Sequence, residues 1–240
     1  MMNGLIVAFG FLTRLPVPRI TFDARAQAAS LKWYPLVGLV LGVLVVGAGA
    51  LLHALPRLPA AAIVLVAWAA LTGGLHLDGL ADSADGWIGG IGDRERTLSI
   101  MKDPRSGPAG VVALVLVLLL KFSALATLPN PWLLLLPPLL GRAAVVAWFQ
   151  TTDYVRAHGL GEPLRGAPSR GCVVALALTL TLCLFFGKPG VVALVAACAT
   201  AWAWRRAGVR RLGGFTGDTA GALVEMVEAV TIVALTAVGG

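Results

Sequence analysis

The stretch that decides the fold is an apolar run at residues 108–128, which reads PAGVVALVLVLLLKFSALATL. It carries a single charged residue, Lys121, and reaches the ~20 residues that a helix needs to cross the hydrocarbon core of a bilayer. Similar apolar runs recur along the chain, at residues 31–54, 59–77, 131–150, 172–186, 190–204 and 219–238. We therefore expect an all-α, polytopic membrane helix bundle with about seven transmembrane helices, within a range of about six to eight.

The two runs at 172–186 and 190–204 are shorter than the others. They form either a hairpin extended by arginine side chains or a pair that does not fully cross the membrane. The composition supports a membrane protein, since 58% of the 240 residues are hydrophobic and 13% are charged, whereas soluble domains have about 25% charged residues. We expect one transmembrane catalytic domain over residues 1–240.

The basic residues lie mostly in alternate connections between the apolar runs. If the N-terminus lies inside, fifteen Lys and Arg residues fall on the inner side, and only Arg57 and Lys188 fall outside. Such an excess is typical of the cytoplasmic side. Acidic residues gather on the same side although orientation does not require them, which indicates a working surface facing the cytoplasm at the cell (inner) membrane. The basic residues are scattered among acids and form no binding motif, so we expect no nucleic-acid partner.

Three aspartates, Asp78, Asp82 and Asp85, follow the second long apolar run. Spacings of four and seven place them on one stripe of a helix, within roughly 40°. Three carboxylates beside lipid repel one another and resist burial unless a cation joins them. Because oxygen ligands favour a hard ion, we expect Mg²⁺ here, with a set of water-facing carboxylates as the alternative. His76, on the opposite face of the helix, is either a packed hydrogen-bonding residue or a substrate contact.

A second group of residues precedes the 108–128 run. Lys102 and Arg105 supply positive charge, and Gly107 and Gly110 leave backbone amides open where a helix begins. That combination suits a phosphate, although Pro and Gly also commonly precede helices that have no binding role.

Two glutamates, Glu225 and Glu228, lie inside the last apolar run. Each would cost on the order of 2–3 kcal/mol if it faced lipid, so they should face the bundle interior. Lys121 and Arg142, which lie in other apolar runs, are natural partners for them. These four residues form either a structural ion-pair network or part of a site, in which the glutamates hold a second metal.

In this order, the segments resemble the cobalamin synthase family, the adenosylcobinamide-GDP ribazoletransferases. Two positions depart from the family pattern, with Pro104 where serine is usual and Val155 where alanine is usual. The segments that carry the resemblance extend from near the start of the chain to its end, and they are Phe11–Arg19, Gly73–Gly86, Met101–Gly110, Tyr154–Gly161 and Gly213–Glu228.

The resemblance implies a reaction in the last steps of cobalamin nucleotide-loop assembly. A hydroxyl of α-ribazole (or its 5′-phosphate) attacks the phosphorus on the cobinamide arm of adenosylcobinamide-GDP, GMP leaves, and adenosylcobalamin (or its 5′-phosphate) forms. It implies Mg²⁺ on the diphosphate and basic side chains beside the GMP. The site residues that we expect are, as catalytic residues, Asp82, Lys102, Arg105 and Glu225; as substrate-binding residues, His76, Asp103, Gly107, Arg142, Thr216, Gly217 and Glu228; and as metal ligands, Asp78, Asp82, Asp85 and Asp218.

Two other kinds of protein use similar residues. One is another Mg²⁺-dependent membrane transferase acting on a diphosphate, either CDP-alcohol phosphotransferase-like or prenyltransferase-like. The other is a cation transporter, because charged residues inside spans can mark an ion pathway, although the two halves show no convincing internal repeat. The lower-ligand base, the number of metal ions, any general base, a homo-oligomer and association with other enzymes of the pathway stay open at this point.

Overall fold

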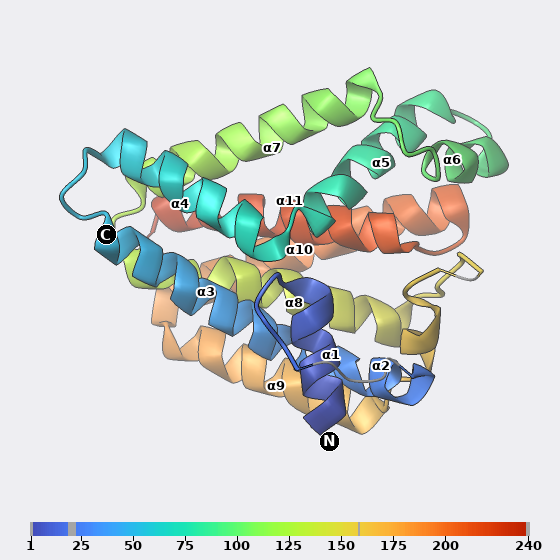
Figure 1. Cartoon of the computed structure of the whole chain (residues 1–240), viewed down its shortest axis with the longest axis horizontal. Coiled ribbons are helices and arrows are strands. Elements are labelled where there is room, and N and C mark those ends of the chain that lie inside the picture. The colour runs from blue at the N-terminus through green and yellow to red at the C-terminus, as the bar shows by residue number, and fades with distance from the viewer. Residues whose placement is uncertain (1, 19–22, 158, 239–240) are drawn as a thin grey trace.

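The computed structural model describes residues 2–18, 23–157 and 159–238, and Figure 1 shows their arrangement. Arg19 and His158, which belong to two of the family-like segments, lie outside the described residues. The described residues form helices and no strands. Their β-type pairing is an isolated parallel bridge between Tyr154 and Phe215. The prediction of an all-α fold is confirmed.

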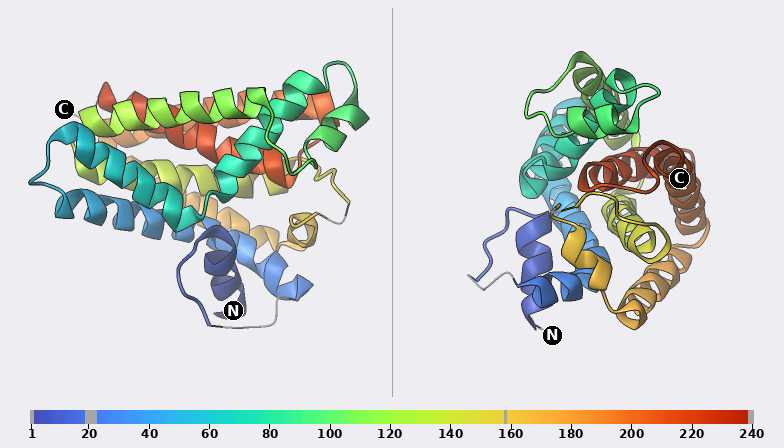
Figure 2. Two further views of the ribbon diagram at one scale, coloured as in Figure 1. Left: turned by 45° about the horizontal axis from the view of Figure 1, so that its top comes forward. Right: turned by 90° about the vertical axis from the view of Figure 1, so that its right-hand side faces the viewer.

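Short loops connect helices of very different lengths. In chain order the helices are α1 (Met2–Leu12), α2 (Ala24–Ser30), η1 (Leu31–Trp33), α3 (Tyr34–Leu51), α4 (Arg57–Thr72), α5 (Leu75–Gly89), α6 (Arg94–Ile100), α7 (Pro108–Thr127), η2 (Pro131–Leu135), α8 (Leu136–Thr151), η3 (Glu162–Gly166), α9 (Ser169–Phe185), α10 (Gly187–Leu212) and α11 (Gly217–Thr236). The long helices lie roughly side by side and α1 crosses them, as Figures 1 and 2 show.

The described helices include four that are long and apolar enough to cross a membrane, or up to five if α4 and α5 together count as one bent span. This number is lower than the expected seven. Helix α9 has 17 residues, somewhat short of a full crossing. Helix α10 is long, but its apolar part is bounded by Lys188 and Arg205. The membrane helix bundle is confirmed, and the segments at 172–204 account for part of the difference.

A sharp bend separates α4 from α5, within the run that the sequence indicated as one span. Gly73 and Gly74 have φ values of 62° and 71°, a left-handed conformation that glycine adopts without steric cost. The two helix axes differ by 89°. Helix α5 therefore leaves the direction of α4 and runs toward the end of the molecule where α6 lies (Figure 1).

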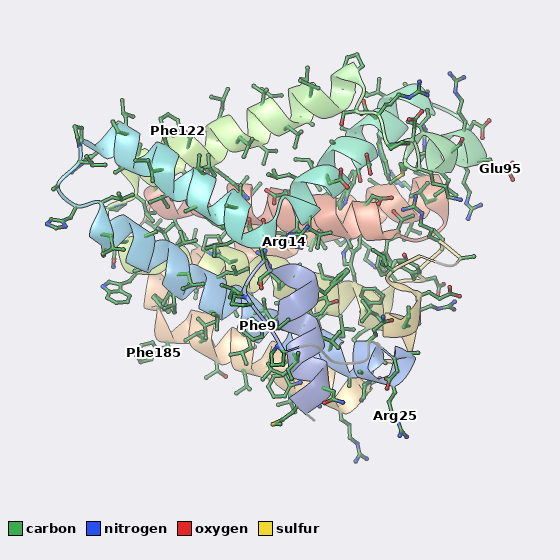
Figure 3. All side chains as sticks on the ribbon, in the orientation of Figure 1. Phe9, Arg14, Arg25, Glu95, Phe122 and Phe185 are labelled. Atoms are coloured by element: carbon green, nitrogen blue, oxygen red, sulfur yellow. The ribbon has the colours of Figure 1, made fainter. Side chains whose placement is uncertain are left out.

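Helix α11 lies at the centre of the bundle, packed against α5, α7, α8 and α10. In the apolar window of α11, 72% of the residues are buried, compared with 17% in α7. The apolar side chains of α7, such as Val115 and Leu119, therefore face outward, as expected for a surface that contacts lipid. Figure 3 shows the outward-facing Phe185 on α9, while Arg25 and Glu95 lie toward the opposite end of the molecule.

Candidate active site

The side-chain carboxylates of two aspartates of α5, Asp78 and Asp82, have no hydrogen bond or ion pair to any other described residue. Asp78 is exposed and Asp82 is half-buried. The start of α11 lies against this helix, because a Cβ atom at Gly79 would be 2.7 Å from the carbonyl oxygen of Asp218. The charge of Asp82 interacts with those of Asp78, Asp218 and Asp85. The expected stripe thus exists, and α11 brings a fourth carboxylate toward it.

Asp85, the third member of the stripe, is bound to the loop before α7. Its Oδ2 accepts the N–H of Gly107 at 2.7 Å, and its Oδ1 accepts the N–H of Gly110 at 2.9 Å. These glycine amides were expected to be open for a phosphate, and that expectation is wrong in this structure. The anion at the start of α7 is the protein's own carboxylate, which the helix dipole stabilises there.

Asp218 forms an ion pair with Arg156, whose Nη1 lies 2.7 Å from its Oδ2. Arg156 also donates to the carbonyl oxygen of Met101 at 3.3 Å. It therefore connects α11, the loop after α8 and the loop after α6. Arg156 was not among the predicted site residues, because a lone arginine in a loop has no spacing pattern, although it lies within the family-like segment Tyr154–Gly161.

Thr216 caps α11. Its Oγ1 accepts the N–H of Thr219 at 3.3 Å, and the Thr219 hydroxyl accepts the N–H of Thr216 at 2.8 Å. The Thr216 hydroxyl also lies 3.3 Å from Asp218. Because Thr216 is fully buried, its role in this structure is to fix the start of the helix that carries Asp218. Gly217, next to it, lines the pocket described below.

The donor set suits Mg²⁺ bound together with phosphate oxygens. Within the described part of the chain, no three His, Cys, Asp or Glu side chains are grouped so that they could hold a metal by themselves. Mg²⁺ in phosphate chemistry is usually held by one or two carboxylates and the substrate's phosphates rather than by an all-protein cage. Asp78 and Asp82, one turn apart and without partners, fit that pattern. Asp85 does not fit it as it stands, because both of its oxygens accept backbone N–H groups.

The loop between α6 and α7 carries the predicted phosphate-binding cations. Arg105 makes a two-point contact with Asp103, in which its Nε and Nη2 lie 3.0 and 2.8 Å from the carboxylate oxygens. This contact lowers the pKa of Asp103 from its ordinary value to about 2. Both side chains are on the surface, and Lys102 beside them is exposed. The cations therefore lie where an arriving anion could reach them.

Lys121, Arg142, Glu225 and Glu228 form a buried ion-pair cluster. The Lys121 Nζ lies 2.5 Å from both glutamates, and Arg142 pairs with Glu228. Each of the four residues is at most 4% exposed. The pairing that the sequence indicated is therefore confirmed, and it joins α7, α8 and α11. Among the described residues, the Glu225 carboxylate pairs with Lys121 alone, and Glu225 does not line the pocket described below. Its position therefore favours a structural role over the predicted catalytic one.

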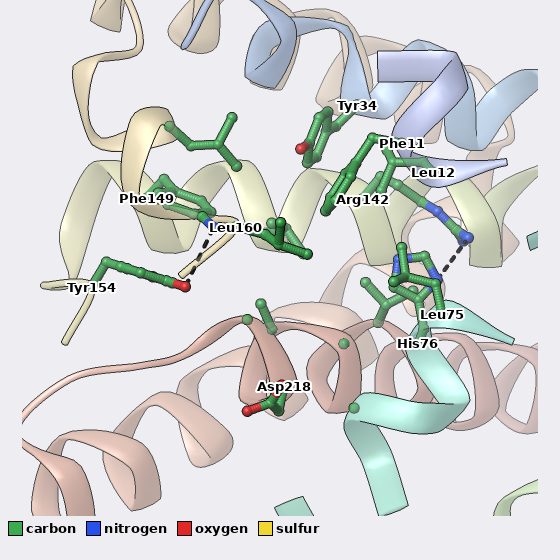
Figure 4. A pocket seen from close by; sticks show the side chains of 18 of the residues that line it. Phe11, Leu12, Tyr34, Leu75, His76, Arg142, Phe149, Tyr154, Leu160 and Asp218 are labelled. Carbon is green, nitrogen blue, oxygen red and sulfur yellow. Dashed lines mark hydrogen bonds between the residues drawn. The ribbon is translucent and has the colours of Figure 1, made fainter. Parts of the chain in front are cut away.

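A pocket of about 180 Å³ lies beside Asp78 and Asp218. Its inner part is formed by Arg142 and His76, whose Nη2 and Nδ1 atoms lie 3.3 Å apart, and Figure 4 shows these side chains together. Arg156 and Leu160 also line it. The walls are mostly apolar and aromatic side chains from α1, α3, α5, α8, η3 and α11, among them Phe11, Tyr34, Val145, Phe149, Leu164 and Val224. Sequence reasoning missed these wall residues because aromatic and aliphatic side chains do not stand out in a membrane protein.

Comparisons with known proteins bear on this arrangement. The family model described as "Cobalamin-5-phosphate synthase" matches residues 4–236. The chain belongs to this family. It is 52% identical over 239 residues to an adenosylcobinamide-GDP ribazoletransferase of Stutzerimonas stutzeri, with 98% of each chain covered. Proteins with the same name from Pseudomonas paraeruginosa and Pseudomonas aeruginosa are 51% and 50% identical, again with 98% of each chain covered. No solved structure matches this chain.

The resemblance to cobalamin synthase that the sequence indicated is confirmed. Several segments that carried it meet at one place in the fold. Gly73–Gly86, Tyr154–Gly161 and Gly213–Glu228 all contribute residues to the pocket wall, and Phe11 of the first segment joins them. Met101–Gly110 is held next to them by the bonds from Asp85 and Arg156.

Proposed function

We propose that this protein is an adenosylcobinamide-GDP ribazoletransferase, which joins adenosylcobinamide-GDP to α-ribazole or its 5′-phosphate. The observation that carries the proposal is the match to cobalamin synthases over nearly the whole chain, with about half of the residues identical to proteins of that name. This match favours the transferase over the phosphotransferase-like, prenyltransferase-like and transporter alternatives.

In the proposed reaction, a ribazole hydroxyl oxygen forms a bond to the phosphorus attached to the cobinamide arm. The bond from this phosphorus to the bridging oxygen breaks, GMP leaves with the electron pair, and the hydroxyl proton is released. Such phosphoryl transfers require mainly positioning and stabilisation of charge. The pocket and the carboxylates of α5 and α11 lie side by side, so one substrate can be held next to the other.

We propose Mg²⁺ as the cofactor, with Asp78 and Asp82 holding it and Asp218 beside them. When bound, the ion neutralises phosphate oxygens and stabilises the leaving group. Asp218 is held by Arg156, which would orient it or compete with the metal for it. Asp85 would act by positioning the loop that carries Lys102 and Arg105.

Lys102 and Arg105 would attract the anionic substrate and offset charge on the departing GMP. Their exposure suits this role, since Arg105 can exchange its contact with Asp103 for a phosphate oxygen. The side of the membrane that carries these residues would face the cytoplasm, in agreement with the excess of basic residues there.

An assay of the purified protein in detergent tests the proposal. Incubation with adenosylcobinamide-GDP, α-ribazole and MgCl₂ should release GMP and form adenosylcobalamin in equal amounts. Omission of either substrate, or addition of EDTA, should stop both products. Folded protein that forms neither product with all components present would refute the proposed activity, whereas activity that survives EDTA would refute only the magnesium dependence.

A further inference from the structure

Arg142, which lines the pocket, has a buried hydrogen-bond donor without an acceptor among the described residues. Arg142 is 1% exposed, and its Nη atoms are engaged by Glu228, His76 and the carbonyl oxygen of Pro138. Its Nε has no hydrogen-bond partner in the part of the chain that the structure describes. A buried donor left unpaired costs about 1–3 kcal/mol, so a ligand that brings an acceptor to Arg142 would remove this cost.

The shape and lining of the pocket restrict what the ligand can be. Its volume of about 180 Å³ is below the roughly 300–1,000 Å³ of pockets for drug-sized ligands, so a corrin ring does not fit. Aromatic rings at Phe11, Tyr34 and Phe149 suit a flat ring system, which they can contact by face or edge. The pocket thus suits a small, flat and largely apolar heterocycle with a hydrogen-bond acceptor.

The two substrates of the proposed reaction offer two such rings, and the lining distinguishes them. Guanine is polar along its edges, whereas most of the pocket wall is apolar, so only the groups beside Asp78 and Asp218 could be paired. The dimethylbenzimidazole type of base has methyl groups on one edge, and its ring nitrogen accepts a hydrogen bond. Unpaired polar groups make a site reject a ligand strongly, so the pocket favours the benzimidazole.

We propose that this pocket binds the base of α-ribazole, with the Arg142 Nε donating to the ring nitrogen and the apolar wall covering the methyl-bearing edge. This assignment rests on the proposed function and adds to it the part of the protein that selects the lower-ligand base. Asp78, Gly217 and Asp218 also border the pocket. A base held at Arg142 therefore directs its ribose toward the carboxylates beside which the diphosphate would lie.

A pair of neighbouring valines on α8 provides a matched test. Val145 lines the pocket, whereas Val146 is equally apolar, fully buried and absent from its lining. Val145→Ala should raise the KM for α-ribazole about tenfold, the factor expected when a ligand loses contact with two methyl groups. It should leave the KM for adenosylcobinamide-GDP unchanged, and Val146→Ala should change neither value.

Free 5,6-dimethylbenzimidazole serves as a second probe. It should inhibit competitively against α-ribazole, and Val145→Ala should weaken this inhibition about tenfold while Val146→Ala preserves it. If Val145→Ala does not fold, Leu164→Ala on η3, also in the pocket wall, should give the same two changes.

The outcomes separate this inference from the proposed function. In one outcome, the wild type turns over both substrates, but Val145→Ala and Leu164→Ala change only the KM for adenosylcobinamide-GDP or change neither KM. This outcome would overturn the base assignment and leave the proposed activity intact. A folded wild-type protein that forms no GMP would refute the activity itself.

Discussion

At the residue scale, the three aspartates of α5 differ in what surrounds them. Asp85 accepts two backbone N–H groups, while Asp78 and Asp82 have no partner among the described residues. Sequence spacing placed all three on one stripe, but it could not show that one of them belongs to the start of α7. That distinction depends on two hydrogen bonds, which Asp85 accepts from residues that lie 22 and 25 positions further along the chain.

Asp82→Asn should lower turnover by about 100–1,000-fold, because it removes charge where the phosphates and the metal would meet. It should also raise the Mg²⁺ concentration needed for half-maximal activity. The matched control is Asp85→Asn, which should lower the melting temperature by weakening the loop contact and leave the Mg²⁺ requirement of the remaining activity unchanged. A Mg²⁺ titration of both purified variants checks this, and an unaltered requirement in Asp82→Asn would contradict the assignment.

Glu225→Gln should destabilise the protein by up to about 3–5 kcal/mol, because it leaves the buried Lys121 with one carboxylate instead of two. We expect turnover per folded molecule to stay the same, since Glu225 lies outside the pocket lining. Thermal unfolding in detergent and the rate per folded enzyme measure the two effects. Glu228→Gln is the comparison, because it also frees Arg142 and should raise the KM for α-ribazole. A lost rate with normal stability in Glu225→Gln would instead support the catalytic role first predicted.

At the element scale, the helices themselves were predictable, while their breaks and contacts were not. Apolar length and composition indicated the helices that became α3, α7, α8 and α11. The run at 59–77 was continuous in hydropathy, yet the structure divides it at Gly73 and Gly74. Two adjacent glycines permit such a bend without requiring it, so hydropathy alone could not reveal it.

The contact between α5 and α11 should be sensitive to one methyl group. Gly79→Ala would place a carbon 2.7 Å from the carbonyl oxygen of Asp218, and the helices would have to separate. We expect a destabilisation of about 1–3 kcal/mol and a loss of activity, because Asp218 moves away from Asp78 and Asp82. Gly47→Ala on α3, where a Cβ meets nothing within 4 Å, should keep activity and stability. Unchanged activity in Gly79→Ala would show that this close approach is not needed.

At the scale of the whole molecule, the motifs identified the family, and charge indicated the orientation. Most residues of the polar half were therefore indicated by the sequence, with Arg156 and the position of Asp85 as exceptions, and so was the pairing of Glu225 and Glu228 with Lys121 and Arg142. The apolar half was not, because the wall residues come from six helices and resemble any other buried side chains. Only tertiary packing brings Phe11, Tyr34 and Phe149 to the same space as His76.

The proposed orientation can be measured with single cysteines in a Cys198→Ser background, which removes the exposed native thiol. Ser106→Cys, in the α6–α7 loop, should react with a membrane-impermeant maleimide only after the inner membrane is permeabilised. Ala54→Cys, in the α3–α4 connection, should react once the reagent reaches the outer face of that membrane. Both positions are exposed, and the opposite labelling pattern would place the site outside the cytoplasm.

The buried ion-pair cluster also has a consequence for biogenesis. Lys121 precedes Glu225 by 104 residues, and Arg142 precedes Glu228 by 86. At a translation rate of about 5–20 residues per second, each glutamate is synthesised roughly 5–20 s after the cation with which it pairs. A nascent chain that stalls before its final helix therefore holds two cations in the bilayer without the carboxylates that pair with them.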